Sequence, residues 1–227
     1  STCEECNSIM ERLIVLDTET TGLDVDDGHK IIEIGCVEIL GRTITSNFYH
    51  QYINPKRQID EKAFEVHGIS NEQLKNEPSF DAIIDNFIDY ISNSALIIHN
   101  APFDMAFLKA EYESANHNQG ELVNNRKVID TLKLARKNSP GKRNTLDALC
   151  SRFFVDNTER NLHGALMDAE LLAQVYLKMT QGQTDITGLN EAKNKPSPES
   201  MHALSNRKQR IIEASEEDIK KHANYFK

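Results

Sequence analysis

The sequence has 227 residues, 39% of them hydrophobic and 27% charged, with a formal net charge of −9. No apolar run approaches the roughly 20 residues that a membrane-spanning helix needs, and the polar start of the chain lacks the regions of a secretory signal, so the sequence predicts a cytoplasmic protein without membrane spans. The acidic balance argues against tight, sequence-independent binding to nucleic acid, because such binding depends on Lys and Arg that neutralise phosphates.

The first part of the chain predicts an antiparallel meander. Three runs of apolar and β-branched residues follow one another with short connections, and the third stops at the turn signal Asn54-Pro55. Cys36 lies in the second run, where a free cysteine behaves as a small hydrophobe, and Cys150 lies in a later apolar run. We expect strands over Leu13–Leu16, Lys30–Leu40 and Phe48–Ile53.

The period of the pattern then changes to that of helices. Apolar residues from Phe80 to Ile91 recur every three or four positions, as on one face of a helix, and Ala95–Ile98 predicts a further buried strand. Asn100-Ala-Pro102 suits the start of a helix, since proline is tolerated in the first turn. Further helices are expected over Thr131–Lys137, Asn144–Phe153 and Gly164–Met179. This order of elements predicts an α/β protein with a mixed sheet, a three-stranded meander plus parallel strands, flanked by helices.

The two ends of the chain differ from the main domain, which we predict to span residues 11–180. Residues 181–206 have the composition of a flexible linker. Residues 207–227 predict a docking segment with a short helix, because Ser215-Glu-Glu-Asp218 resembles an N-terminal capping box. Near the N-terminus, Cys3 and Cys6 have the C-x-x-C spacing, but no second pair or nearby His completes a zinc site. We therefore predict that residues 1–10 are disordered rather than folded around a metal ion.

One segment is basic within this acidic chain. Between Arg126 and Arg143, seven Lys or Arg residues accompany a single acid, Asp130. Such a run is usually a solvated helical face. Beside a site that handles phosphates it would have a different meaning, so its interpretation depends on what lies near it in the fold.

Two carboxylates follow the first predicted strand. Asp17 and Glu19 are two residues apart, so both point to the same face if the strand continues through them. If the strand has already ended, the pair lies in a solvated turn instead. Holding two carboxylates at the end of a buried strand is costly unless something compensates their charge.

Two later segments repeat this arrangement. In Ile97-Ile-His-Asn-Ala-Pro-Phe-Asp104 a strand ends and an acid follows on the first helical turn, close to Asp17 if the two strands are neighbours. In His163-Gly-Ala-Leu-Met-Asp168 the two side chains converge only if His163 lies in the loop ahead of the helix. Taken singly, both aspartates also fit first-turn residues that favour the helix dipole, and His163 fits a surface histidine.

Together, four acids and one histidine at strand and helix ends suit a site for phosphoryl transfer with two metal ions. Oxygen ligands in this number match Mg²⁺ or Mn²⁺ rather than structural zinc. Two ions about 3.5–4 Å apart would clamp the attacking and leaving oxygens of a displacement at phosphorus. His163 is the candidate general base for the attacking water.

The residues and their order resemble the DEDDh exonucleases, the DnaQ-like branch of the RNase H-like fold. The D-x-E-T-T-G, H-N-A-x-F-D and H-x-x-x-x-D segments of that family are present at Asp17–Gly22, His99–Asp104 and His163–Asp168. The resemblance covers about residues 12–183 and is greatest for proofreading members that act with bacterial replicative DNA polymerases. It implies that the general base is His163 and that two Mg²⁺ or Mn²⁺ ions are bound by Asp17, Glu19, Asp104 and Asp168.

The resemblance also implies a substrate site, an activity and partners. His67 should contact the terminal nucleotide, and the pocket for the 3′-terminal sugar and base should be lined by Thr20, Leu23, Asn100 and Phe103, together with Asp17, Glu19 and Asp168. The activity implied is removal of 3′-terminal nucleotides from DNA as nucleoside 5′-monophosphates. The partners implied are the 3′ end of DNA, the catalytic alpha subunit of the polymerase through the C-terminal segment, a theta subunit and a sliding clamp.

Two positions depart from the family pattern, and two alternatives stay open. Lys62 stands where close relatives carry Glu, and Gln183-Thr-Asp-Ile-Thr-Gly-Leu189 matches the clamp-binding peptide only at its Gln and aliphatic positions. One alternative is a stand-alone exoribonuclease or oligoribonuclease of the same family. The other is a non-catalytic nucleic-acid-binding module, which we would expect to lack at least one of the acids, and none is missing here.

Overall fold

The computed structural model describes residues 11–117, 126–160 and 162–181. These residues belong to the first of two units of the chain, which spans residues 1–182. The N-terminal segment predicted at 1–10 lies outside the described residues, as do the docking segment and all but the first residue of the predicted linker.

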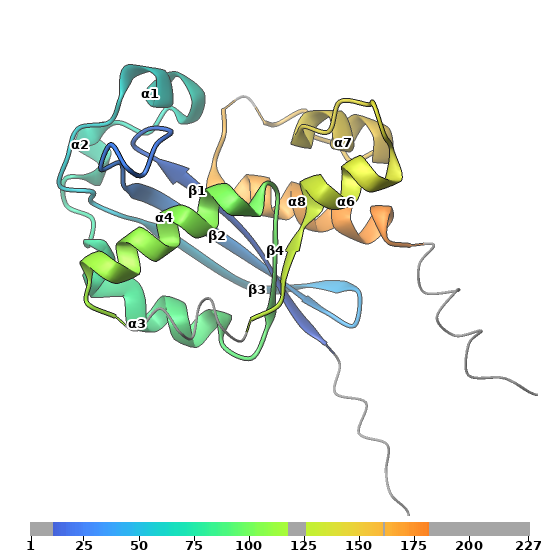
Figure 1. Ribbon diagram of the computed structural model, residues 1–227, viewed down its shortest axis with the longest axis horizontal. Coiled ribbons are helices and arrows are strands. Elements are labelled where there is room, and N and C mark those ends of the chain that lie inside the picture. Colours follow the sequence, from blue (N-terminus) through green and yellow to red (C-terminus); the bar gives the residue numbers. More distant parts are fainter. Residues whose placement is uncertain (1–10, 118–125, 161, 182–227) are drawn as a thin grey trace, which may run out of the picture. The chain divides into compact units, whose positions relative to one another are not determined.

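A mixed five-stranded sheet forms the centre of this unit, with the strand order β3-β2-β1-β4-β5 (Figure 1). Strands β1, β2 and β3 are antiparallel neighbours and form the predicted meander, whereas β4 and β5 run parallel to β1. The RNase H-like α/β architecture is thereby confirmed. The strands are β1 Arg12–Thr20, β2 Ile31–Leu40, β3 Thr43–Tyr52, β4 Ala95–Ile98 and β5 Val128–Asp130.

Alternation along β1 directs its side chains to two different helical layers. Ile14 and Leu16 pack with the helices α3 (Phe80–Ile91) and α4 (Ala101–Ser114) on one face. On the other face, Leu13 and Val15 pack against α8 (Ala165–Met179). Both faces of the sheet are therefore covered. Near the C-terminal end of β1, odd-numbered residues face α8 and even-numbered residues face α3 and α4.

The remaining helices lie at the ends and edges of this core. A separate apolar cluster joins α8 to α6 (Thr131–Asn138) and α7 (Leu146–Phe153), and Figure 1 shows α6 and α7 beside each other next to α8. The short helices α1 (Glu61–His67) and α2 (Asn71–Leu74) follow the meander. Among the described residues, no helix is both long enough and apolar enough to cross a membrane.

The strongly periodic segments were predicted within a few residues. The predicted helix Phe80–Ile91 and the predicted strand Ala95–Ile98 have the observed bounds, and Cys36 and Cys150 are buried free cysteines as expected. The pattern gave too short a first strand, because β1 continues through Asp17 and Glu19 to Thr20. Helices α1 and α2 and strand β5 were not predicted.

Candidate active site

The first carboxylates lie where β1 runs beneath the start of α8. Because β1 remains a strand to Thr20, Asp17 and Glu19 share the α8 face with Leu13 and Val15, and the alternative of a solvated turn is wrong. Gly35 on β2 pairs with Asp17. A Cβ atom at Gly35 would lie 2.2 Å from the carbonyl carbon of Ala165, so only glycine lets the first turn of α8 approach the sheet this closely.

A buried carboxylate holds the start of α8 to the same strand. Glu33 accepts a 3.1 Å hydrogen bond from the backbone N–H of Ala165 and a 2.7 Å hydrogen bond from His50 Nε2 on β3. Its side chain is only 3% exposed. A negative charge at a helix N-terminus is favourable because the free N–H groups there carry partial positive charge. Glu33 therefore fixes the helix that carries Asp168.

The third carboxylate comes from the opposite layer. The parallel pairing of β1 with β4 directs both strands to the same edge, and Asp104 follows β4 on the first turn of α4. Asp104 is 3% exposed, and its Oδ1 accepts a 2.7 Å hydrogen bond from the hydroxyl of Thr18. The expected proximity of Asp104 to Asp17 is met, because both carboxylates line one cavity and the charge of Asp104 helps to raise the pKa of Asp17.

The histidine segment also has the arrangement that convergence requires. His163 lies in the loop ahead of α8, and Gly164 is the N-cap in an extended conformation. The backbone N–H of His163 donates a 3.1 Å hydrogen bond to the carbonyl of Val66. The imidazole is exposed, and its Nδ1 lies 3.3 Å from Oδ2 of the buried Asp168. His163 thus lies at the border between the acids and solvent.

One arginine neutralises part of this acidic cluster. Arg160 forms a two-pronged pair with Asp168, with Nε–Oδ1 at 2.6 Å and Nη2–Oδ2 at 2.7 Å. A third hydrogen bond of 2.7 Å joins its Nη1 to Asp147, and its Nη2 lies 2.9 Å from Nδ1 of His163. The Arg160 side chain is only 6% exposed, so the pair is shielded from solvent.

The other acids are forced toward their neutral form. Burial, followed by the charges of Asp104 and Asp168, raises the pKa of Asp17 well above its usual value. Burial is also the main reason that the pKa of Glu19 rises to about 8 and that of Asp104 to about 7. For Asp168, burial is outweighed by hydrogen bonds from Arg160 and His163, and its pKa is lowered.

This pattern fits divalent cations. Ionising several buried carboxylates in one place is unfavourable unless positive charge is bound among them, and a set of carboxylate oxygens with one imidazole matches hard cations such as Mg²⁺ and Mn²⁺. Ligand atoms of Glu19, His163 and Asp168 lie within 4.8 Å of one another. The residues present therefore suit the metal ions that the sequence implies.

Two cavities adjoin the acids. The larger, of about 670 Å³, contains all four carboxylates and His163 and is bordered by cationic side chains of α6 and the loop before α7. The smaller, of about 460 Å³, contains the apolar side chains of Leu23, Ala63 and Val66. Thr18, Glu19 and Phe103 line both cavities, so the acids lie where the two cavities meet.

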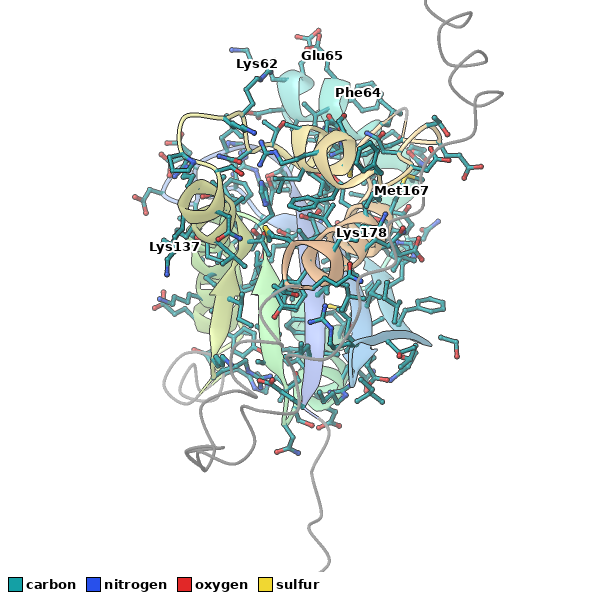
Figure 2. All side chains as sticks on the ribbon, turned by 90° about the vertical axis from the view of Figure 1, so that its right-hand side faces the viewer. Lys62, Phe64, Glu65, Lys137, Met167 and Lys178 are labelled. Carbon is teal, nitrogen blue, oxygen red and sulfur yellow. The ribbon has the colours of Figure 1, made fainter. Side chains whose placement is uncertain are left out.

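The residues expected to bind the terminal nucleotide lie mostly around the smaller cavity. It is lined by Thr20, Leu23, His67 and Phe103, whereas Asn100 lines neither of these two cavities and is the N-cap of α4, with a φ of 67°. Lys62, the departure from the family pattern, extends from α1 (Figure 2) and also lines the smaller cavity.

His67 carries a buried polar atom that suits a ligand. Its Nδ1 accepts a hydrogen bond of 3.0 Å from the backbone N–H of Ile69, so the ring proton is on Nε2. The residue is 5% exposed, and its Nε2 makes no well-formed hydrogen bond among the described residues, although the backbone of Thr20 lies close enough to raise the pKa of the ring against the lowering effect of burial. A buried N–H without a well-formed hydrogen bond is costly, and a nucleotide oxygen in the adjacent cavity would satisfy it.

Sequence reasoning missed the residues that support the acids. Thr18, Glu33 and Arg160 act through contacts with residues far along the chain or with a loop that has no motif. For Glu33 there was one usable signal, a charged residue within the apolar run of β2, which is buried nearly throughout. Arg160 had a weaker signal, its position three residues before His163.

The chain is similar to exonucleases over most of its length. A family model described as "Exonuclease" matches residues 14–176. DNA polymerase III subunit epsilon of Salmonella typhimurium is 45% identical over 224 residues, which cover 95% of this chain and 92% of that protein. The epsilon subunit of Escherichia coli is 49% identical over 184 residues, which cover 79% and 76%. The epsilon subunit of Rickettsia felis is 42% identical over 218 residues, which cover 95% of each.

Solved structures agree on the fold. Exonuclease X in complex with 5′-overhanging duplex DNA aligns with a TM-score of 0.59 and 25% identity, covering 76% of this chain and 93% of that one. The nuclease domain of 3′hExo, a DEDDh family member bound to rAMP, aligns with a TM-score of 0.66 and 19% identity, covering 77% and 94%. With the motifs and the site described above, the chain belongs to the DEDDh exonuclease family and, within it, to the DNA polymerase III epsilon subunits.

Proposed function

We propose that the chain hydrolyses the 3′-terminal phosphodiester bond of DNA and releases a nucleoside 5′-monophosphate, with metal ligands at Asp17, Glu19, Asp104 and Asp168 and with His163 as the general base. The observation that carries the proposal is the convergence of four carboxylates from β1, α4 and α8 with an exposed histidine in one cavity. Membership of the epsilon family supports 3′–5′ proofreading as the biological role.

His163 has the position that a general base needs. It lies in a loop whose backbone is tied to Val66, and its ring is exposed at the cavity that contains the acids. The ring accepts a proton from water as the water oxygen bonds to phosphorus. The bond from phosphorus to the 3′ oxygen breaks, and that oxygen takes a proton from solvent, so the shortened strand ends in a 3′ hydroxyl and the phosphate stays on the released nucleotide.

The acids hold the cations that this reaction uses. When bound, Mg²⁺ or Mn²⁺ stabilises charge on the phosphate oxygens and lowers the pKa of a bound water. Asp17 and Glu19 are presented from one strand face, and Asp104 is oriented by Thr18. The high pKa values of Glu19 and Asp104 return toward their ordinary range once positive charge is present between them.

The smaller cavity suits the terminal nucleoside. Phe103 offers a ring on which a base can stack irrespective of its identity, and the Nε2 proton of His67 suits an oxygen of the sugar or phosphate. Because the cavity meets the acids at Glu19 and Phe103, a nucleoside held there has its 5′ phosphate beside the carboxylates. This arrangement corresponds to cleavage at the 3′ end.

Substitution with a matched control tests the catalytic assignment. Asp17→Asn and His163→Ala should each reduce Mg²⁺-dependent release of nucleoside monophosphate, His163→Ala by about 10²–10⁴-fold, while circular dichroism stays that of the wild type. Glu170→Gln removes an exposed carboxylate of α8, two residues beyond Asp168, and should keep the wild-type rate. Wild-type rates in either of the first two variants are incompatible with the proposal.

The nature of the substrate is decided by direct comparison. A 3′-mismatched DNA primer–template and matched single-stranded DNA and RNA of equal sequence are digested in parallel with Mg²⁺ and with Mn²⁺. Faster removal of the mismatched DNA terminus supports proofreading, whereas a preference for short RNA would favour the oligoribonuclease alternative.

Assembly with a polymerase would supply the affinity that an acidic chain lacks. With a net charge of −9 the enzyme should bind DNA weakly, and tethering would raise its effective concentration at a primer end. We therefore expect residues 181–227 to bind the polymerase catalytic subunit, in the cytoplasm. Capture of that subunit by the full chain and by a chain ending at Thr180 tests this, and equal capture by both would count against it. Binding of the theta subunit and of the clamp, through Gln183–Leu189, is measured in the same way.

A further inference from the structure

The basic run between Arg126 and Arg143 divides into two groups in the fold. Arg126 and Lys127 lie just before β5, at the end of the parallel strands opposite to the acids. There, Arg126 donates a hydrogen bond of 3.2 Å to the carbonyl of Ser94, and Lys127 pairs with Glu11 at 3.3 Å. Neither residue lines the larger cavity. The later cations of the run follow β5 and lie at the same end of the strands as the acids.

Only three of the later cations line the larger cavity. We call Arg136, Lys142 and Arg143 the basic rim. All three are exposed, and within the described part of the chain none has an ion-pair partner. By contrast, Lys133 lies 4.0 Å from Asp130, and Lys137 extends outward at the periphery of the molecule (Figure 2). The cations of α6 therefore point to two different surfaces.

The loop that carries Lys142 and Arg143 is held in place from inside. Asn144 is 9% exposed; its Nδ2 donates to the carbonyl of Lys142 at 2.9 Å, and its Oδ1 accepts from Arg152 at 2.9 Å. Arg152 also donates to the carbonyl of Arg143. The two cations are thus mounted on a backbone that is fixed by a buried amide, which lowers the ordering cost of binding a phosphate.

The position of the rim gives the substrate a direction. The smaller cavity and the basic rim both adjoin the acids, and Thr18, Glu19 and Phe103 are common to the two cavities. A strand whose terminal nucleoside lies in the smaller cavity extends, beyond the scissile phosphate, into the larger one. We infer that Arg136, Lys142 and Arg143 bind the backbone phosphates on the 5′ side of the scissile bond. This inference rests on the proposed function.

Phosphate binding by the basic rim should change the salt dependence of DNA binding. Each phosphate contact to a single strand contributes about −0.7 to the slope of log affinity against log salt concentration. Removing two rim cations should therefore make the slope shallower by about 1.4. Two cations of the same run that face elsewhere should leave the slope unchanged, although they alter the net charge of the protein by the same amount.

The experiment compares two double variants of the full chain, Lys142→Gln with Arg143→Gln and Lys133→Gln with Lys137→Gln. Release of nucleoside monophosphate is measured on a single-stranded DNA octanucleotide and on a dinucleotide, over a range of KCl concentrations. We expect kcat/KM of the rim variant on the octanucleotide to fall at least tenfold, with a rise in KM. On the dinucleotide, which has no phosphate beyond the scissile one, the fold-loss in kcat/KM should be at least five times smaller. The control variant should behave as the wild type on both.

A binding measurement separates this inference from the proposed function. Binding of a fluorescently labelled octanucleotide is measured by anisotropy for both double variants in an Asp17→Asn background, where no turnover is expected. Weaker binding and a shallower salt slope in the rim variant support the inference even if hydrolysis by the wild-type chain were not observed. Equal binding by the rim and control variants overturns it, and so does an equal loss of kcat/KM on the dinucleotide and the octanucleotide. Capture of an acidic protein partner by the rim, with DNA binding unchanged, also overturns it.

Discussion

The hydroxyl of Thr18 donates a 2.7 Å hydrogen bond to Oδ1 of Asp104 and so joins the end of β1 to the first turn of α4. Thr18 lies on the opposite face of the strand from its neighbours Asp17 and Glu19, which face α8. One strand end therefore serves both helical layers, and the acids of the two layers meet because alternate residues of β1 face each of them.

This hydrogen bond should matter for both stability and turnover. Thr18→Val keeps the shape of the side chain but removes the hydroxyl donor of the buried Asp104, which then retains only its backbone donors. Losing a hydrogen bond to a buried group costs about 1–3 kcal/mol of unfolding free energy. We expect kcat to fall about tenfold, equivalent to about 1.4 kcal/mol, because Asp104 is no longer held in one orientation. Thr18→Ser restores the donor and should recover most of the rate. Denaturant unfolding and steady-state kinetics provide the measurements, and equal behaviour of the valine and serine variants would contradict this role.

Removal of the arginine beside Asp168 should make the fold dependent on divalent cations. Arg160→Gln leaves a buried carboxylate without its counter-ion, and breaking such a pair costs about 3–5 kcal/mol. We expect a large drop in the midpoint of thermal unfolding in EDTA and a partial recovery in Mg²⁺, since a bound cation replaces the lost positive charge. Asp147→Asn, which removes an exposed partner of the same arginine, should cost at most about 1 kcal/mol. An Mg²⁺-induced shift no larger than that of the wild type would disprove the expectation.

Stability in the absence of divalent cations should decrease as the pH rises. The pKa of Glu19 is about 8 in the folded chain and about 4.3 when unfolded, so the folded state retains a proton that the unfolded state has lost. The stabilisation is complete below about pH 4 and is lost as the pH passes through 8. We expect the free energy of unfolding in EDTA to fall over this window, with a shallower fall in Glu19→Gln. Urea unfolding from pH 5 to 8.5 measures it, and a pH profile identical in the two proteins would be the contrary result.

The close approach of α8 to the sheet should make Gly35 intolerant of any side chain. In Gly35→Ala the new methyl group would lie 2.2 Å from the Ala165 backbone, so the helix must move. We expect a loss of about 1–3 kcal/mol in stability and of about 10²-fold in kcat, because shifts of about 1 Å in a catalytic group have that effect. Gly164→Ala, whose methyl group would meet no atom within 4 Å, should have a much smaller effect on both. Comparable losses in the two variants would refute the steric explanation.

Sequence patterns predicted the elements whose own residues define them. Helix α3 and strand β4 carry a full apolar period, and their bounds could be read directly. Strand β5 is only three residues long and half-buried, and it is a strand because β4 offers it hydrogen bonds. Helices α1 and α2 have seven and four residues, too few for a period to emerge.

The site divides in the same way. Asp17, Asp104 and His163 could be proposed from the sequence, because each follows a recognisable strand or precedes a recognisable helix, and the fold brings them to one cavity. The supporting residues were not, because their roles depend on long-range contacts. Glu33 reaches Ala165 across 132 residues of sequence, and no local pattern indicates which helix a buried carboxylate will hold. The sequence shows Lys142 and Arg143 only as part of a basic run. The fold shows that these two residues line the larger cavity and that Lys137 does not.

The residues that build the site are far apart in the sequence. Thr18 and Asp104 are separated by 86 residues, and Glu33 and Ala165 by 132, so the site can form only late in synthesis of the chain. During synthesis the first carboxylates emerge early, but they remain an incomplete set until the helix carrying Asp168 has left the ribosome. A growing chain therefore lacks the complete set of proposed metal ligands until that point, and we expect it to be inactive before then. Loss of the tertiary fold should, by the same reasoning, abolish cleavage at once, so a damaged molecule becomes harmless rather than indiscriminate.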